Sequence, residues 1–554
     1  MDTASAIFGA QSIDYTALLP VLLVAGGALA VLLADLFLSA DRKPWLSWAT
    51  IGVIVASLAS ELALWTSRTI VPRSTFCVPG AKGAATSALS CSYAVDNFTL
   101  TLQTLVLAAT VLVVLMAPRR FKVPFGEYHF LLLSSLTGAL VLVAARDFIT
   151  ITVALETLSL PAFALVGFGR RAGGEAALKF FLMSIASTAV MLFGISLVYG
   201  ATGSVFFDRV SAGLSHVSAL GGAQAQVAGV GVVLTLVGFG FKISAVPFHF
   251  WTPEVYAGAP IPVAAYLSVV SKAAGFAGLI LTVVAAFRPY LHSLSILLAV
   301  LAAVTMTVGN VIALRQRSAV RLLAWSTVAQ AGYVLVPLAV SKSNQVSASI
   351  AYLVLYAVMN LGAFAVVSAV FGDSDVPGGG AVTRRTDVTA LQAPSGGELA
   401  AYRGMYRQRP RAALALAFFL LCLAGLPPGV MGLFAKVAVF KAAMTGDVAW
   451  LAVVMAVNVV IALYYYLRWA AVLFDVSLFG AAQLTTTGIG TLSATPDSAA
   501  ALSPTRTLPA LAPKLAVGIA FVLAVVFSFW PNPALDATST WPWVVSSGPA
   551  AAPR

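Results

Sequence analysis

The sequence predicts an all-α, polytopic membrane protein with about fourteen transmembrane helices. Of its 554 residues, 60% are apolar and only 9% are charged, whereas soluble domains average about 45–50% apolar and about 25% charged residues. The apolar residues also gather in long runs, and a helix needs about 20 such residues to cross a bilayer. A large soluble catalytic domain is therefore excluded, because the spans leave room only for loops and two inserts.

Fourteen apolar runs are long enough to span. In chain order they are 17–39, 45–66, 99–117, 127–145, 147–169, 176–200, 225–247, 259–287, 291–314, 319–340, 347–371, 412–446, 447–474 and 513–531. Two stretches between them, 372–397 and 481–508, are rich in small, polar and Pro residues and cannot build a core. Residues 398–409 interleave apolar and basic side chains, which predicts a short amphipathic helix on the inner membrane surface.

The distribution of basic residues orients the chain. Lys and Arg number 32 against 20 Asp and Glu, a net charge of +12, which in a soluble protein is typical of nucleic-acid binding but here indicates topology. Loops with odd numbers carry 16 basic residues and loops with even numbers carry 7. Because positive residues collect on the cytoplasmic side, we expect odd loops inside, both termini outside, and no nucleic-acid partner.

The cysteines and histidines give no sign of a cofactor on this chain. Cys77, Cys91 and Cys422 form no CxxC motif or four-thiolate set, and the four histidines are scattered. Haem attachment, an iron–sulfur cluster and a structural zinc site therefore lack ligands. Cys77 and Cys91 share the second loop, which we expect to face oxidising conditions. A disulfide between them and two free thiols both stay open, because sequence does not fix the Cα separation.

Two sets of five spans suggest an inverted repeat. Spans four to eight and nine to thirteen have the same number, and an odd-numbered unit reverses its orientation when a copy follows it. The fourth member of each set is interrupted by proline: span seven at Pro247 and Pro253, and span twelve at Pro427 and Pro428. Paired broken helices point to an ion path near the membrane midplane.

This pattern predicts four regions. They are a three-helix segment at 1–120, the first repeat at 121–288, the second repeat at 289–475 with a cytoplasmic insert at 372–411, and a linker with a last helix at 476–554.

Four ionisable residues lie deep inside predicted spans. Glu156 follows Asp147 by nine residues, about 14 Å along a helix, and so lies near the middle of the bilayer. Lys242 precedes Pro247 by five residues, whereas Lys272 and Lys436 lie in spans eight and twelve. Charge facing lipid costs about 2.5–3.5 kcal/mol even on the lenient scale, so such residues face a protein interior or water and are candidates for function.

Weaker candidates have simpler explanations. Lys179 is a secondary candidate, because Glu175 four residues earlier makes an ordinary helix ion pair with it. Lys441 lies near a span end and is expected to reach the interface. His249 is expected to pack or hydrogen-bond beside the break in span seven, since a lone histidine is a poor metal site. We interpret Lys436 as the counterpart of Lys242 in the second repeat.

Five strings of the sequence resemble subunit N of the bacterial proton-translocating NADH:quinone oxidoreductase, respiratory complex I, a family of antiporter-like subunits. They are LETLSLPAFALVGF (155–168), FKISAVPFHFWTPEVYAGAP (241–260), STVAQAGY (326–333), MNLGAF (359–364) and GLPPGVMGLFAK (425–436). The resemblance covers roughly 95–475 and implies the fourteen-helix fold with inverted five-helix repeats. It carries the family's proton path onto Glu156, Lys242, Lys272 and Lys436. One departure is Gln330, where relatives usually have His, because Gln does not change protonation near neutral pH.

The resemblance implies a membrane-arm subunit of a translocase that has no redox chemistry on this chain. Flavin, iron–sulfur clusters and quinone are expected in partner subunits, which include a second antiporter-like subunit and small membrane subunits of a bacterial inner membrane. In this hypothesis Lys242 is loaded and emptied of its proton as its separation from Glu156 changes, Lys272 passes protons sideways, and Lys436 exchanges them with one side. The alternatives are a subunit of a multisubunit cation/proton antiporter, a non-pumping membrane scaffold, and a stand-alone solute transporter, which no substrate motif favours.

Overall fold

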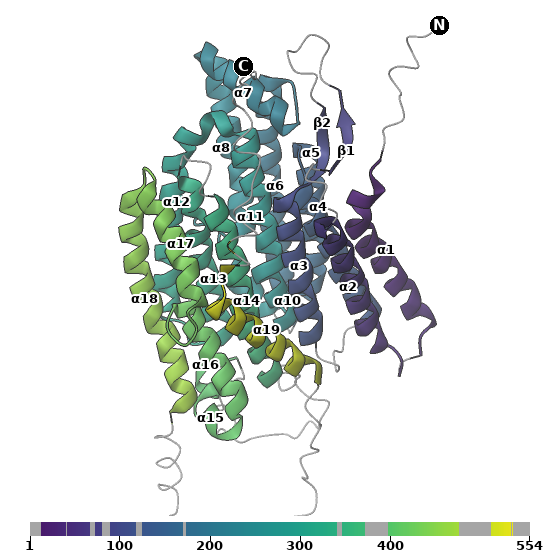
Figure 1. Cartoon of the computed structure of the whole chain (residues 1–554), viewed down its shortest axis with the longest axis vertical. Helices are drawn as coiled ribbons and strands as arrows, with labels where there is room; N and C mark the ends of the chain where they lie inside the picture. The colour runs from purple at the N-terminus through teal and green to yellow at the C-terminus, as the bar shows by residue number, and fades with distance from the viewer. Residues whose placement is uncertain are drawn as a thin grey trace, which may run out of the picture.

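The computed structural model of the chain confirms a helical membrane protein (Figure 1). It describes residues 13–39, 41–66, 73–79, 89–117, 124–169, 173–340, 346–371, 397–475, 511–532 and 535. Within these ranges, 13 helices are long and apolar enough to cross a membrane. Two shorter helices, α16 (Pro410–Ala424) and α17 (Met431–Thr445), together make up the broken twelfth span. The predicted number of spans is therefore confirmed, whereas most of the two inserts lies outside the described residues.

The N-terminal region consists of three spans and one hairpin. The helices are α1 (Tyr15–Phe37), α2 (Trp45–Thr66) and α3 (Asn97–Met116), and the antiparallel strands are β1 (Arg73–Val78) and β2 (Ser90–Val95). The hairpin is an addition to the all-α prediction. Cys77 lies opposite Cys91 in it, and their sulfur atoms are bonded at 2.03 Å.

Asp14 precedes α1 and caps it by accepting hydrogen bonds from the backbone N–H groups of Thr16 and Ala17. Burial raises the pKa of Asp14, but these hydrogen bonds, that of the Thr16 hydroxyl and the charge of Arg73 outweigh it, so the pKa lies below its usual value. The Arg73 guanidinium, at the start of β1, lies 3.4 Å from the Asp14 carboxylate. The hairpin is thereby fixed to the start of the first span.

Spans four to eight follow in order. They consist of α4 (Phe125–Ala144), α5 (Phe148–Gly167), α6 (Gly173–Thr202), a connecting helix α7 (Phe207–Leu220), α8 (Gly222–Ile243) with α9 (Trp251–Gly258), and α10 (Ile261–Tyr266) continued by α11 (Lys272–Leu281). Short π-helical turns at Leu267–Ser271 and Thr282–Ala286 flank α11, and a 3-10 turn, Arg288–Tyr290, ends the set. Span seven is thus broken between α8 and α9, as its prolines predict.

Spans nine to thirteen repeat the pattern. They consist of α12 (Leu291–Ala313), α13 (Ala319–Leu335) with the 3-10 turn Pro337–Ala339, α14 (Val346–Phe371), the pair α16 and α17, and α18 (Ala449–Phe474). The last helix, α19 (Leu511–Phe529), packs against α14 and α3. The single amphipathic helix predicted at 398–409 is wrong. The chain instead forms a 3-10 turn, Leu399–Tyr402, and a short α15 (Met405–Gln408), because Gly404 between them has a left-handed φ of 66°.

Matching contacts relate the two sets of spans. A Cβ on Gly138 of α4 would lie 2.3 Å from the backbone nitrogen of Leu158 in α5, and one on Gly309 of α12 would lie 2.6 Å from that of Ala329 in α13. Both residues of the second pair stand 171 positions after those of the first. In both sets the glycine therefore lets the first two helices touch at the same register.

The ends of the sets match as well. The residue before α5 and the residue before α13 each form an isolated antiparallel bridge with the connection that follows the third helix: Asp147 with Phe206, and Ser318 with Glu398. The connecting helices α7 and α15 lie at opposite ends of the molecule (Figure 1). The contacts are thus those of an inverted repeat, whereas the exact boundaries at 120, 288 and 475 stay predictions.

Candidate functional site

Lys242 is buried at the last turn of α8. Its side chain is 4% exposed, and its ammonium group donates a hydrogen bond of 2.7 Å to the Ser159 hydroxyl of α5. The stem of Lys242 passes over α11 where Gly275 leaves space, because a Cβ there would lie 2.9 Å from the lysine Cγ. Sequence analysis predicted Lys242 but missed Ser159, which lies one turn after Glu156 in the same string.

Glu156 is half-buried on α5. Its carboxylate accepts a hydrogen bond of 2.8 Å from the Thr188 hydroxyl of α6. It is also close enough to Lys242 to interact with it electrostatically. The structure therefore places the predicted carboxylate and ammonium within electrostatic reach of each other, with Ser159 bonded to the ammonium group and Thr188 bonded to the carboxylate.

The break in span seven exposes backbone groups that side chains satisfy. The α8 helix ends at Ile243 and is followed by Ser244, whose left-handed φ of 62° turns the chain before Pro247. The Trp251 indole N–H donates to the Phe241 carbonyl at 2.9 Å, and the Val246 N–H donates to the Thr305 hydroxyl of α12 at 3.0 Å. A broken helix in a membrane persists only when neighbouring groups take over its lost hydrogen bonds.

Lys272 completes this set from the next span. Its side chain is 2% exposed and its ammonium group donates to the carbonyl of Ile243, the last residue of α8, at 3.0 Å. A helix C-terminus carries partial negative charge on its free carbonyl groups, so a cation is favourable there. Lys272 directly follows the π-helical turn, in which Ser268 accepts a hydrogen bond of 2.8 Å from Asn360 of α14.

Lys436 occupies the corresponding place in the second repeat. It is 6% exposed, lies on α17 after Pro427 and Pro428, and donates to the carbonyl groups of Leu423 and Ala424 at 2.9 and 2.6 Å. Ala424 is the last residue of α16, just as Ile243 is the last residue of α8.

Lys436 and Lys242, which we interpreted as counterparts, both belong to the broken fourth span of their set but lie on opposite sides of its break. Lys242 precedes its break and binds a hydroxyl group, whereas Lys436 follows its break. In its contact, Lys436 matches Lys272, because each ammonium group holds the carbonyl that ends the first half of a broken helix. The number of residues between each lysine and the nearest proline did not reveal this match. The match depends on which helix supplies the ammonium group that binds the carbonyl at the break.

Lys179 lies outside this buried set. Its side chain is 42% exposed and its ammonium group is paired with Glu175 at 2.9 Å and with Glu254 of α9 at 2.8 Å. Exposed ion pairs contribute little to stability, about 0–1 kcal/mol. These contacts favour the structural explanation of Lys179, while its secondary role stays untested.

Gln330 lies in a network of uncharged groups. Its amide N–H donates to the Tyr466 hydroxyl at 3.3 Å, and its carbonyl oxygen accepts from the Tyr352 hydroxyl. His249 packs its ring against Trp325, with 5.2 Å between ring centroids, as the packing explanation predicts.

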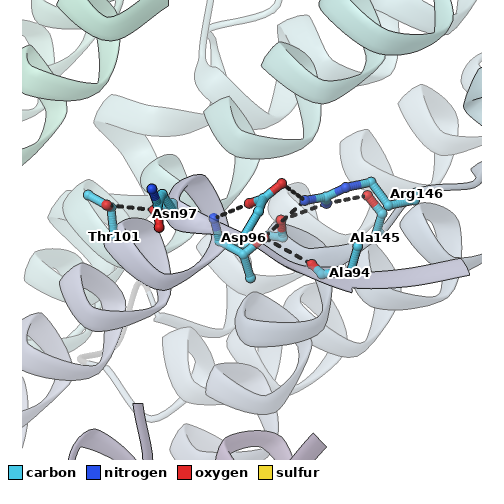
Figure 2. A network of polar contacts seen from close by, with 8 residues as sticks. Ala94, Asp96, Asn97, Thr101, Ala145 and Arg146 are labelled. Carbon is cyan, nitrogen blue, oxygen red and sulfur yellow. Dashed lines mark hydrogen bonds and ion pairs between the residues drawn. The ribbon is translucent and has the colours of Figure 1, made fainter. Parts of the chain in front are cut away.

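An ion pair that sequence analysis missed lies at the hairpin end of the molecule. Asp96 caps α3 and accepts a hydrogen bond of 2.9 Å from Arg146, with the two side chains 5% and 7% exposed (Figure 2). Arg146 also donates to the Ala145 carbonyl and the Thr99 hydroxyl. Arg146 lies between the predicted spans 127–145 and 147–169, and its burial became evident only from the tertiary structure.

No group of three or more His, Cys, Asp or Glu side chains suited to a metal ion occurs among the residues that the structure describes. The chemistry of the site therefore consists of one carboxylate, three buried ammonium groups and the hydroxyl, amide and carbonyl groups around them. Such groups are able to hold and pass on protons.

Comparisons with known proteins agree with this geometry. Residues 145–462 match the family described as NADH:quinone oxidoreductase/Mrp antiporter, TM. The chain is 54% identical over 475 residues to NADH-quinone oxidoreductase subunit N 2 of Streptomyces griseus, covering 84% of this chain and 83% of that protein. It is 42% identical to subunit N of Salinispora tropica, covering 84% and 86%.

Solved structures give the same fold. A chain of respiratory complex I from Thermus thermophilus matches with 29% identity and a TM-score of 0.67, covering 94% of this chain and 99% of that one. A chain of the Mrp complex from Dietzia matches with 20% identity and a TM-score of 0.73, covering 95% and 97%, which is a likeness of fold alone.

Proposed function

Because the chain belongs to the family of NADH-quinone oxidoreductase subunit N, we propose that it is a membrane-arm subunit of a respiratory complex I and translocates protons through Glu156, Lys242, Lys272 and Lys436. The observation that carries the proposal is that these three lysines are buried and hydrogen-bonded at or beside the two broken helices. Static packing needs no such charges, which are costly in a membrane interior.

A conformational change acts on the proton affinity of Lys242 by altering the distance between Lys242 and Glu156. Two opposite charges about 4 Å apart at an effective dielectric constant of about 20 interact by about 4 kcal/mol. Moving one charge across 100 mV needs about 2.3 kcal/mol. Movement of the two side chains between close contact and a larger separation therefore changes the proton affinity of Lys242 by enough to work against a membrane potential.

Lys272 and Lys436 act as the receiving sites. Each ammonium group is held by the last carbonyl of a half-helix, which favours its charged form while burial favours the neutral one. A small displacement of the half-helix changes this balance. We assign lateral transfer to Lys272 and exchange with one side of the membrane to Lys436.

The driving energy comes from outside this chain. By the names of its relatives, NADH oxidation and quinone reduction take place in the same complex, so we propose partner subunits that hold flavin, iron–sulfur clusters and quinone. The partners in the membrane are a second antiporter-like subunit and small membrane subunits. We place the chain in a bacterial plasma membrane with both termini outside, on the distribution of basic residues.

Purification in mild detergent tests the assembly. The chain should come out with subunits that show flavin and iron–sulfur absorbance and NADH:quinone activity. The likeness in fold to the Mrp complex makes a cation/proton antiporter the second candidate. Recovery with other antiporter subunits and without flavin would establish that candidate instead.

A further inference from the structure

The second helix, α2, buries polar residues against its neighbours and exposes large apolar residues on its outer faces. Large apolar side chains such as Trp45, Trp48 and Leu62 are exposed on its outer faces. Its buried side chains are Leu46, Thr50, Ile54, Ser57 and Glu61, which recur every three or four residues and so form one stripe. Three of these five are polar, and α2 packs against α1, α3 and α4.

Several buried polar atoms that have no hydrogen-bond partner within the described part of the chain gather at the end of the stripe next to the α1–α2 loop. His129 of α4 bonds Ser47 through Nε2 at 3.0 Å, but its Nδ1 atom has no hydrogen-bond partner. The Thr50 hydroxyl and the Oδ1 atom of Asp35 also lack partners. Asp35 comes close to α4 one turn before His129, because a Cβ on Gly126 would lie 2.4 Å from that of Asp35.

A second group of such atoms lies at the hairpin end. Glu61 is 1% exposed, and neither of its carboxyl oxygens has a hydrogen-bond partner. The amide oxygen of Gln103 in α3 is also without a partner, although its N–H groups donate to Leu140 and to the Tyr93 hydroxyl. Glu61 interacts electrostatically with Tyr93, which places the three side chains in one neighbourhood.

Among the residues that the structure describes, no charged side chain forms an ion pair with Glu61. Arg146 is held by Asp96 at 2.9 Å, and Lys43, beyond the other end of the stripe, is held by Asp35 at 2.8 Å. An ionised carboxylate without a partner in a protein interior is too costly to persist, and even a neutral polar group left without a hydrogen bond costs about 1–3 kcal/mol. A buried water needs two to four polar partners, which both groups of atoms provide.

We propose that the stripe of α2 is a hydrated proton-exchange site in the N-terminal three-helix segment, with Glu61 as its protonatable group. Water molecules bind between Thr50, His129 and Asp35 at one end and between Glu61 and Gln103 at the other. Glu61 exchanges its proton with this water. The site goes beyond the proposed proton path, because none of its residues belongs to the buried lysine set.

The reactivity of introduced cysteines tests whether water reaches the stripe of α2. Thr50→Cys and Ser57→Cys in the assembled complex are treated with 2-aminoethyl methanethiosulfonate, and peptides of this chain are read by mass spectrometry. Ala520→Cys on α19 is the dry control, because Ala520 is also 0% exposed but lies among Ala516 and Ala524. Both stripe cysteines should react at least about tenfold faster than the control, since the thiolate that reacts forms only where water is present. Reaction as slow as at Ala520→Cys would overturn the proposal.

Infrared spectroscopy tests whether Glu61 carries a proton that exchanges with water. Wild-type complex should show a C=O band of a protonated carboxyl group that Glu61→Gln removes, and the band should shift on mixing with D₂O. Glu127→Gln is the matched control, because Glu127 is exposed and lies outside the stripe, so its replacement should leave this band unchanged. An identical spectrum of Glu61→Gln, or a band that does not shift in D₂O, would contradict a hydrated, protonated Glu61. Neither measurement depends on proton pumping.

Discussion

At the residue scale, the proposed proton path depends on which acceptor each buried ammonium group binds. Sequence identified the lysines themselves, because charge in an apolar run stands out. It did not identify Ser159, Ile243 or Ala424 as their acceptors, since these contacts join residues that are far apart in the chain. It also missed Glu61, which lies close to a span end, where a long side chain is expected to reach the interface.

Removing the Ser159 hydroxyl tests the Lys242 contact. Ser159→Ala leaves a buried ammonium group without its acceptor, a change of about 1–3 kcal/mol. We expect the rate of proton pumping by the assembled complex to fall several-fold, measured by a pH-sensitive dye in vesicles. Ser196→Ala is the control, because the exposed Ser196 hydroxyl bonds only a carbonyl of its own helix. Equal pumping by the two variants would remove Ser159 from the proton path.

Removing the Asp96 carboxylate tests the ion pair of Figure 2. Asp96→Asn removes the buried carboxylate charge that faces Arg146, and removing one partner of a buried ion pair costs about 3–5 kcal/mol. We expect a lower melting temperature and less assembled complex on native gels. Asp14→Asn is the control, because its pair with Arg73 is partly exposed and should contribute about 0–1 kcal/mol. An unchanged melting temperature for Asp96→Asn would show that Arg146 finds another partner.

At the scale of elements, the prolines predicted where two helices break but not how the breaks are held. Proline in the interior of a helix removes a hydrogen bond, so Pro247 and Pro428 were informative in sequence alone. Which groups replace the lost bonds depends on packing, as the contacts of Trp251 and Thr305 show. The small hairpin and the two-part helix at 398–409 likewise depend on the anchoring of the chain by neighbouring elements.

Two glycines test the repeat. Gly138→Ala places a methyl group 2.3 Å from the backbone of the neighbouring helix, and Gly309→Ala places one 2.6 Å from it. Overpacking of this kind costs about 1–3 kcal/mol. Both should lower the melting temperature of the complex by similar amounts. Gly52→Ala on α2, where nothing lies within 4 Å, should leave it unchanged or raise it slightly. A large effect at only one of the two contact positions would argue against equivalent roles.

At the scale of the whole molecule, the number of spans and their order followed from composition and periodicity. Apolar runs of sufficient length leave a chain few choices in a membrane. The relative positions of the spans were not predictable in this way, because lipid and protein interior are equally apolar surroundings for a helix. The two sets of five spans predicted the inverted repeat, and pairs such as Gly138 and Gly309 show which contacts of the two sets correspond.

The orientation of the whole chain is testable with single cysteines. We predict that the α1–α2 loop lies inside and the hairpin outside, since basic residues gather in the odd loops. In intact cells an impermeant maleimide should label Leu89→Cys, which is 63% exposed in the wild type, but not Ser39→Cys. Ser39→Cys should react once the membrane is permeabilised. The reverse pattern would invert the proposed topology.

Proton pumping by complexes that carry Lys242→Met, compared with complexes that carry Lys179→Met, tests directly whether the buried lysines transfer protons. Both variants remove one ammonium group, but Lys242 is 4% exposed at a broken helix and the Lys179 side chain is 42% exposed in a surface ion pair. The account predicts that NADH-driven acidification of inverted vesicles falls at least about tenfold for Lys242→Met and stays near the wild-type rate for Lys179→Met, at equal amounts of assembled complex. Undiminished acidification with Lys242→Met would contradict the role of the buried lysines.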